Sequence, residues 1–141
     1  MNLAAIQQEL RKQNLDGWLF FDHHIRDPLA YRILGIPTGK VSRRWYYMIP
    51  AEGDPKGMEH RIERNTLAGL PGEMIPYSSW PEQLAALGRL TAGMKRVAMA
   101  YSPMCAVPYV ANVDAGTIEL VCSTRVEVVS AAELIQMFEA T

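Results

Sequence analysis

The densest group of chemically capable side chains is the run Asp22-His23-His24-Ile25-Arg26-Asp27. Histidine can act as a general base or a metal ligand near neutral pH, and arginine can hold a carboxylate with two parallel hydrogen bonds. We therefore predict that His23, His24 and Arg26 contact a substrate or a facing subunit. The competing interpretation is a solvated loop in which Asp27 only caps the next helix.

Catalysis would need partners that the sequence does not provide. Two adjacent histidines need a third ligand to hold a metal ion, and no HExxH or similar spacing supplies one. A two-metal nuclease needs several carboxylates at strand ends, and Asp22 has no evident partner for that chemistry. GxSxG, Walker-loop and GxGxxG motifs do not occur. We predict no catalytic, cofactor-binding or metal-binding residue here, and for catalysis we favour the solvated loop.

The element that must position this run is the stretch Gly17–Asp22, GWLFFD, in which four large apolar residues follow one another. A strand with one wet face would alternate, so the unbroken run predicts a strand covered on both faces. Such strands lie in the middle of α/β sheets, and ligands gather at their carboxyl ends. The candidate contacts therefore follow the predicted central strand at its ligand-binding end.

The remaining patterns alternate between helix and strand, as in an α/β domain. Helices are predicted near residues 3–14, 28–34, 80–92 and 131–138, and strands near 45–49, 58–62, 73–77 and 97–101. Residues 45–62 are expected to form a hairpin around the turn 51–55. A short helix ending at residues 114–116 is predicted next, followed by β-like segments at 117–122 and 126–129.

Several side chains carry specific expectations. Asp27, Ser79 and Ser130 are predicted to cap helices. Trp80, Leu84 and Leu87 are expected on one helix face, and Met58, His60 and Ile62 on one strand face, with His60 hydrogen-bonded in the core or an interface. Arg43 and Arg44 are expected at a solvated sheet edge, and Cys105 and Cys122 as buried reduced thiols.

Composition sets the remaining limits. The chain has 141 residues and a formal net charge of −1, with 49% hydrophobic and 21% charged residues, which is typical of one globular domain. This balance gives no electrostatic footprint for nucleic acid and no basic tract for an anionic membrane. Met1 leads directly into helix pattern without a signal peptide, which indicates the cytoplasm. The last helix has no closing signal before Thr141, so we expect the natural chain to continue.

The order of these segments resembles the amino-terminal domain of the creatinase/prolidase family, which includes Xaa-Pro aminopeptidases and dipeptidases. The resemblance is carried by DGWLFFD, DPLAYRILGI, WYYMIPAEGDP and YSSWPEQLAALGRL, and by RVAMAYSPMCAVPYVANVDAGTIELV. It covers essentially all of residues 1–141. It implies a three-layer α/β/α domain with a mixed sheet of ribonuclease-H-like topology.

The same resemblance implies a catalytic pita-bread domain beyond Thr141. There, two Asp, one His and two Glu would hold two divalent ions (Mn, Co or Zn) that activate a water. The present chain would then be non-catalytic, without a cofactor of its own. Its expected partners are its own catalytic domain, a second subunit in a homodimer, and a peptide substrate at the entrance that it helps to shape. A free-standing binding module and the domain of a creatinase-like amidinohydrolase stay open as alternatives.

Overall fold

The computed structural model describes residues 1–39 and 41–139, which contain a six-stranded sheet in the order β4-β3-β2-β1-β5-β6. Neighbouring strands are parallel except where β2 pairs with β1 and β3, so β2 alone runs opposite to the rest. The mixed sheet of ribonuclease-H-like topology is as predicted. Strand β4 extends it beside β3. The strands are β1 (Gly17–Asp22), β2 (Trp45–Pro50), β3 (Lys56–His60), β4 (Glu73–Tyr77), β5 (Arg96–Met99) and β6 (Glu127–Ser130).

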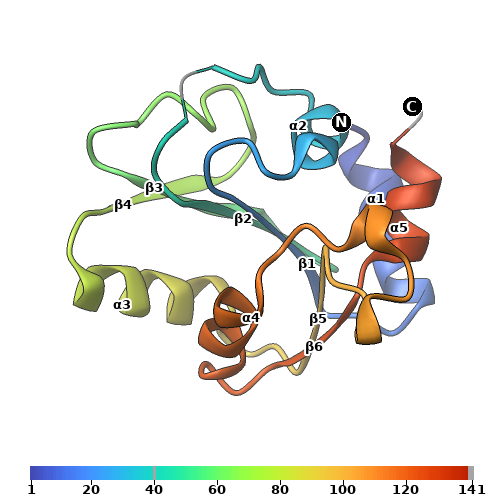
Figure 1. Cartoon of the computed structure of the whole chain (residues 1–141). Helices are drawn as coiled ribbons and strands as arrows, with labels where there is room; N and C mark the ends of the chain where they lie inside the picture. Colours follow the sequence, from blue (N-terminus) through green and yellow to red (C-terminus); the bar gives the residue numbers. More distant parts are fainter. Residues whose placement is uncertain (40, 140–141) are drawn as a thin grey trace.

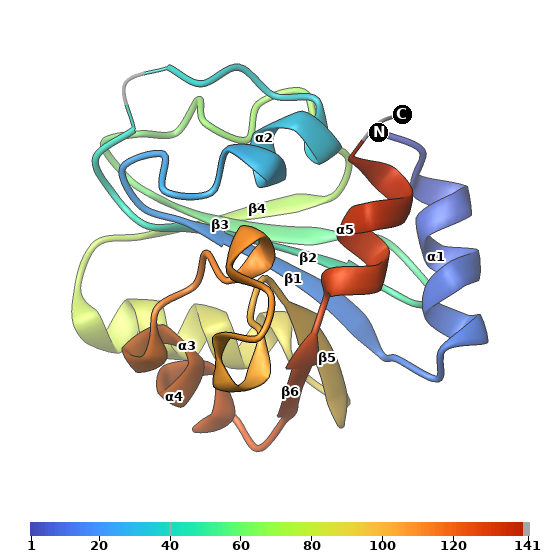
Figure 2. The same ribbon diagram turned by 45° about the vertical axis from the view of Figure 1, so that its right-hand side comes forward.

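Helices cover both faces of this sheet and make three layers (Figures 1 and 2). One face carries α1 (Leu3–Lys12), α2 (Pro28–Leu34) and α5 (Ala132–Phe138), and the other carries α3 (Trp80–Leu90) and α4 (Ala115–Cys122). The start of α1 and the end of α5 lie close together (Figure 2). The predicted α/β/α architecture is therefore confirmed.

Strand β1 is the centre of the domain, as its unbroken apolar run predicts. All six of its residues are buried, because both neighbouring strands and helices on both faces exclude water. The ring of Phe20 stacks on Trp18 with centroids 4.4 Å apart, whereas Phe21 points to the other face and meets Tyr46 at 5.0 Å. Alternation along the strand thus supplies large side chains to two separate cores.

Most of the predicted local signals are present. The Asp27 carboxylate accepts a hydrogen bond from the Ala30 amide at the start of α2, and Gly35 ends the helix at φ 73°. Gly35 suits this position because a left-handed residue without a side chain closes a helix at little cost. At α3, Ser79 and Glu82 form the predicted capping box. Strands β2 and β3 form the predicted hairpin.

Two segments differ from their predicted structure. Residues 117–122, expected to be β-like, form most of α4, because the Asp114 side chain accepts a hydrogen bond from the Thr117 amide and starts a helix. Asp114 therefore begins a helix, where we expected one to end. Before α5 the cap is Ala131 without a side-chain bond, because the Ser130 hydroxyl instead accepts from the Ala132 amide.

Some side chains also lie elsewhere than their periodicity predicts. Trp80 and Leu84 are exposed, because α3 buries the face that carries Gln83, Ala86, Leu87 and Leu90. Ile62 is exposed because β3 ends at His60, and the strand alternation ends with it. His60 is half-buried beside Tyr77, with ring centroids 5.5 Å apart, and its Nδ1 accepts from the Ile62 amide.

The cysteine and arginine expectations need correction as well. Cys105 and Cys122 are free thiols but exposed, because Cys105 lies on a surface turn and Cys122 on the outer side of α4. Arg43 and Arg44 do not protect a sheet edge, because β2 is an internal strand between β1 and β3. In the part of the chain that the structure describes, no helix is long and apolar enough to cross a membrane.

Candidate functional site

One edge of the sheet brings together segments that are far apart in the sequence. Strands β1, β4 and β5 end at this edge, and β2 begins there because it runs the opposite way, so Asp22 pairs with Trp45. A pocket of about 370 Å³ opens at this edge. Its lining residues are Phe21, His23, Arg26, Arg44, Trp80, Asp114, Gly116, Thr117 and Leu120. We call it the cationic pocket.

The buried Asp22 side chain holds the loop that follows β1. The Asp22 carboxylate accepts hydrogen bonds from the amides of Ile25 and Asp27, both at 2.9 Å, and from the Tyr31 hydroxyl. Tyr31 in turn accepts from the Trp45 indole at 3.1 Å. With both oxygens engaged by its own chain, Asp22 organises the loop and is not free to bind a ligand.

This bracing supports an uncommon backbone. His24 and Ile25 adopt φ values of 59° and 55°, in the left-handed region that a β-branched residue such as Ile rarely enters. Conformations of this kind cost free energy and persist where surrounding contacts enforce them. Two of the contacts that hold this conformation are the hydrogen bonds from the Ile25 and Asp27 amides to Asp22.

Asp27 connects the loop to the opposite side of the pocket. Its Oδ1 accepts from the Ala30 amide at 3.3 Å and from the Asn112 side-chain amide at 3.2 Å, two residues before Asp114. Burial raises the pKa of Asp27 to about 6, and the nearby Asp22 charge acts in the same direction. The two carboxylates therefore form a buried structural network beneath the pocket.

Two of the three predicted contact residues, His23 and Arg26, line the cationic pocket, and His24 does not. His23 is half-buried and lines the pocket, and Arg26 lines it while remaining exposed. His24 is exposed and lies edge-on to His23, with ring centroids 4.3 Å apart, outside the pocket lining. Burial and the positive charges around it lower the pKa of His23, so its imidazole is neutral at pH 7.

Seven of the nine lining residues were not anticipated as site residues, and Arg44 is one of them. Arg44 donates from Nη1 to the Gln83 side chain at 3.2 Å, and its guanidinium carbon lies 5.7 Å from the centre of the Trp80 ring. The Tyr46 hydroxyl also donates to Gln83, at 2.8 Å. No sequence signal placed Arg44 here, because it lies beside the carboxyl end of β1 only through the antiparallel pairing of β2 with β1.

The wall formed by α4 contributes one carboxylate, but its own helix engages it. Asp114 accepts from the Thr117 amide at 3.0 Å and from the Thr117 hydroxyl at 2.7 Å. Although partial burial opposes the shift, these hydrogen bonds hold the pKa of Asp114 below its usual value. Asp114 is therefore ionised at neutral pH and partly balances the two arginines of the pocket.

The arrangement suits binding better than reaction. Arg26 and Arg44 both line the pocket, and arginine side chains are suited to bind carboxylates and other planar anions. The described residues contain no group of three or more His, Cys, Asp or Glu side chains that could hold a metal ion. A two-metal centre thus does not fit these described residues.

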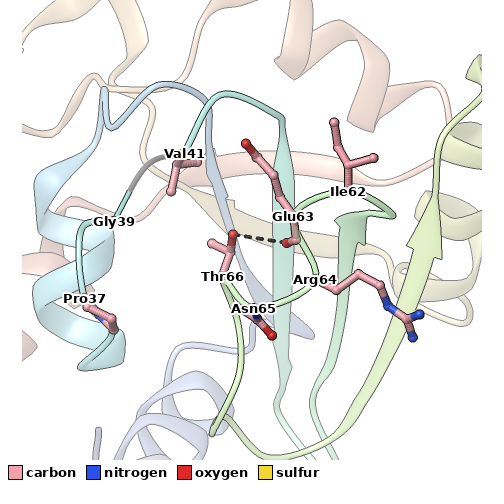
Figure 3. A pocket seen from close by; sticks show the side chains of 8 residues that line it. All are labelled: Pro37, Gly39, Val41, Ile62, Glu63, Arg64, Asn65 and Thr66. Carbon is pink, nitrogen blue, oxygen red and sulfur yellow. Dashed lines mark hydrogen bonds between the residues drawn. The ribbon is translucent and has the colours of Figure 1, made fainter.

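A second hollow of about 270 Å³ lies along the loops before β2 and after β3 (Figure 3). Its carboxylate, Glu63, is already engaged by the Ser42 hydroxyl at 2.7 Å and the Arg43 amide at 2.8 Å, so it ties the two loops together. The Arg64 side chain extends away from Val41 in Figure 3. Because no charges converge in it, this hollow is a weaker candidate than the cationic pocket.

Comparison with known proteins places this geometry in a known fold. No protein-family model and no curated protein matches the chain. Among solved structures, a proline dipeptidase from Streptococcus pneumoniae TIGR4 aligns with a TM-score of 0.72 and 16% identity, covering 99% of this chain and 97% of that one. The creatinase/prolidase N-terminal domain of an X-Pro dipeptidase from Streptococcus pyogenes aligns at 0.66 and 10%, covering 91% and 97%.

The chain has the creatinase/prolidase N-terminal domain fold. The prolidase from Pyrococcus horikoshii OT3 also aligns, with a TM-score of 0.64 and 17% identity over 94% of this chain. This chain spans only 33% of that prolidase. In this creatinase/prolidase-type domain, the cationic pocket lies where open α/β sheets meet ligands.

Proposed function

We propose that this chain is the non-catalytic amino-terminal domain of a proline-specific metallopeptidase, an Xaa-Pro dipeptidase or aminopeptidase. The observation that carries the proposal is the fold match over 94–99% of the chain to structures named prolidase and proline dipeptidase. In this proposal a catalytic domain after Thr141 holds two Mn, Co or Zn ions. A cytoplasmic location is part of the same proposal, and cell fractionation tests it.

In this proposal the domain contacts the substrate and takes no part in the bond cleavage. The cationic pocket opens at the edge of the sheet, where it narrows the entrance to a metal site in its own or a partner subunit. Arg26 and Arg44 bind a carboxylate of the peptide, and the neutral His23 imidazole forms a hydrogen bond with the peptide. None of these residues transfers a proton in the reaction. Homodimer formation through this domain belongs to the same proposal.

The deciding experiment extends the chain. The gene is read beyond the codon for Thr141, and its full product is purified and assayed with Xaa-Pro dipeptides in the presence of Mn²⁺, Co²⁺ or Zn²⁺. We expect metal-dependent hydrolysis by the full product and none above buffer by residues 1–141 alone. Turnover that follows the purified 141-residue chain, or a full product inactive on every Xaa-Pro peptide, contradicts the proposal.

The strongest alternative is a free-standing binding module. It is favoured by the cationic pocket itself, because two arginines and a half-exposed tryptophan line one hollow of this domain. A stop codon directly after Thr141, combined with saturable anion binding, would select the module. Hydrolysis of creatine in place of peptides would select the amidinohydrolase.

A further inference from the structure

The two edge strands of the sheet differ in the backbone groups that they leave open. The sheet ends at β4 on one side and at β6 on the other, and the described residues contain no further strand beside either of them. In an edge strand that pairs with a parallel neighbour, every second residue turns its N–H and its C=O away from that neighbour. These outward groups are the ones that can pair with another strand.

On β6 the outward residues are Val128 and Ser130, which are both partly exposed. The amides of Glu127 and Ala131 donate to carbonyls of residues 95 and 99 at 2.7 Å and 2.8 Å, so the odd-numbered residues of this segment face β5. Val128 and Ser130 therefore turn their N–H and C=O groups away from β5, and these groups form no hydrogen bond with a described residue. Each of the two residues offers one donor and one acceptor at the open side of β6.

The edge at β4 is blocked by its sequence. The Arg61 amide donates to the Tyr77 carbonyl at 2.9 Å, so the outward residues of β4 are Met74 and Pro76. Pro76 has no N–H, and proline on an edge strand protects the edge against pairing with another chain. The outward residues of β6 are a valine and a serine, which give no such protection. The sheet therefore has one blocked edge and one open edge.

We propose that β6 pairs with β6 of a second copy of this chain in an antiparallel arrangement, which joins the two sheets across a two-fold axis. In one register, Val128 of each copy lies opposite Ser130 of the other, and every outward N–H meets an outward C=O. Val129 then lies on the axis. This inference rests on the homodimer of the proposed function and names the surface that forms it.

The charges around β6 favour a second copy in this arrangement. Arg125 precedes the strand and Glu133 belongs to the first turn of α5, and both are exposed without an ion pair to any described residue. Arg125 lies three residues before Val128, and Glu133 lies three residues after Ser130. The proposed register therefore sets Arg125 of one copy level with Glu133 of the other, and the symmetry repeats this pair. A parallel pairing would instead set Arg125 level with Arg125.

The helices next to β6 add surface to this contact. One short strand edge is too small by itself, since stable interfaces bury roughly 1,200–2,000 Å² in total. Helix α4 packs beside β6 on one face and α5 follows β6 on the other, so a two-fold axis perpendicular to the sheet brings each helix toward its own copy. Ile118 and Leu120 of α4 are half-buried, and Met137 of α5 is 48% exposed. Apolar side chains are therefore available on both faces.

The first test measures the self-association of the 141-residue chain by sedimentation equilibrium, which separates it from any peptidase assay. Val128→Pro removes the outward N–H and leaves the hydrogen bonds between β5 and β6 in place. Val128→Ala is the matched control, because it shortens the same side chain and keeps the N–H. We expect Val128→Pro to raise the Kd of the dimer by about tenfold or more, since each copy loses one hydrogen bond. Val128→Ala should have a clearly smaller effect.

Charge reversal tests the register at two exposed side chains. Arg125→Glu sets two carboxylates level with each other, and we expect it to raise the Kd of the dimer by about three- to tenfold at low salt. The double variant Arg125→Glu/Glu133→Arg restores the pair with its signs exchanged. Its Kd should return to near that of the original chain.

Cross-linking tests the position of the axis. Opposite residues of a pair without hydrogen bonds between them have Cα atoms about 4.5 Å apart, which suits a disulfide. In a chain that carries Cys105→Ser and Cys122→Ser, Val129→Cys should therefore form a cross-linked dimer on oxidation. Ile75→Cys, which faces β3 from the blocked edge as Val129 faces β5 from the open one, is the control and should stay monomeric.

Several results would overturn the inference. They are a chain that stays monomeric up to about 1 mM, a folded Val128→Pro variant with an unchanged Kd, a double reversal that recovers nothing, and equal cross-linking of Val129→Cys and Ile75→Cys. If circular dichroism shows that Val128→Pro does not fold, charge reversal and cross-linking decide. A full product that cleaves Xaa-Pro peptides despite a contrary result preserves the proposed function and removes only this interface. A β6 dimer in a full product without peptidase activity preserves only the interface.

Discussion

Strand β1 and the loop that follows it are adjacent in sequence but are stabilised by different forces. Every residue of β1 is buried, and its apolar side chains supply both cores. The loop carries the exposed His24 and Arg26, and two buried carboxylates hold it in place. Asp22 is the boundary, because it is the last residue of the strand and the first hydrogen-bond acceptor of the loop. In this domain, apolar burial stabilises the central strand, and a network of polar hydrogen bonds fixes the loop beside the cationic pocket.

The largest effect should come from the strand. Phe20→Ala removes a ring that is 4% exposed and stacked on Trp18, and we expect it to lower the free energy of unfolding by about 3–5 kcal/mol. Urea denaturation followed by circular dichroism measures the change. Ile62→Ala, at a side chain that is 67% exposed, is the control and should change stability by less than about 0.5 kcal/mol. A wild-type midpoint for Phe20→Ala would show that β1 is not the centre of the fold.

The second-largest loss of stability should come from replacing Asp22, the last residue of β1. Asp22→Ala leaves the Tyr31 hydroxyl and the amides of Ile25 and Asp27 without their acceptor, and we expect a loss of about 2–4 kcal/mol. Hydrogen exchange should show the loop opening while α1 stays protected. Asp54→Ala changes an exposed carboxylate in the turn between β2 and β3 and serves as the control. If both variants behave alike, the loop does not depend on the buried network.

Asp27 should make stability depend on pH with a defined sign. Its pKa is about 6 in the folded domain and near 3.8 in an unperturbed chain, so the folded state binds the proton more tightly. The contribution of Asp27 to stability therefore falls as pH rises from about 4 to about 6, and then stays constant. Asp27→Asn keeps the helix cap without the charge, and we expect it to be about 2 kcal/mol more stable than wild type at pH 7.5.

Thermal unfolding of both proteins between pH 4 and pH 8 measures this difference. The advantage of Asp27→Asn should shrink steadily below pH 6 and vanish near pH 4. A constant difference across the range would mean that Asp27 does not titrate in the folded state, and a destabilised variant at pH 7.5 would mean that its negative charge is needed there.

The smallest effect on stability should come from Arg26, which forms no hydrogen bond or ion pair with the described residues. Arg26→Ala should change the unfolding free energy by less than about 0.5 kcal/mol. In the longer metallopeptidase that we propose, Arg26→Ala should raise KM by about tenfold or loosen the proposed dimer, with metal content unchanged. Arg64→Ala, beside the second hollow, is the matched control. Loss of bound metal would make the loop a ligand, and no change in KM, assembly or rate would restore the solvated-loop interpretation.

The sequence by itself determined the features that depend on neighbouring residues. The unbroken run of β1, the Asp27 cap with Gly35, the Ser79 capping box and the β2–β3 hairpin are all as predicted. These features follow from side-chain periodicity and from hydrogen bonds that reach only a few residues along the chain. For the same reason His23 and Arg26 could be placed at the end of the central strand, where ligands bind.

Only the tertiary structure decided which distant segments meet. Residues 117–122 have strand-forming side chains but fold as α4, which packs beside β6. The Asp114 cap that starts this helix is a local signal that our prediction missed. Trp80 has the spacing of an apolar helix face with Leu84 and Leu87, but it lines the pocket. The reason is the rotation of α3, which buries the face that carries Gln83 and Leu87. Arg44 joins Arg26 because β2 runs against β1. Strand direction and helix rotation are properties of the packed sheet, so no local pattern could have placed these residues in one pocket.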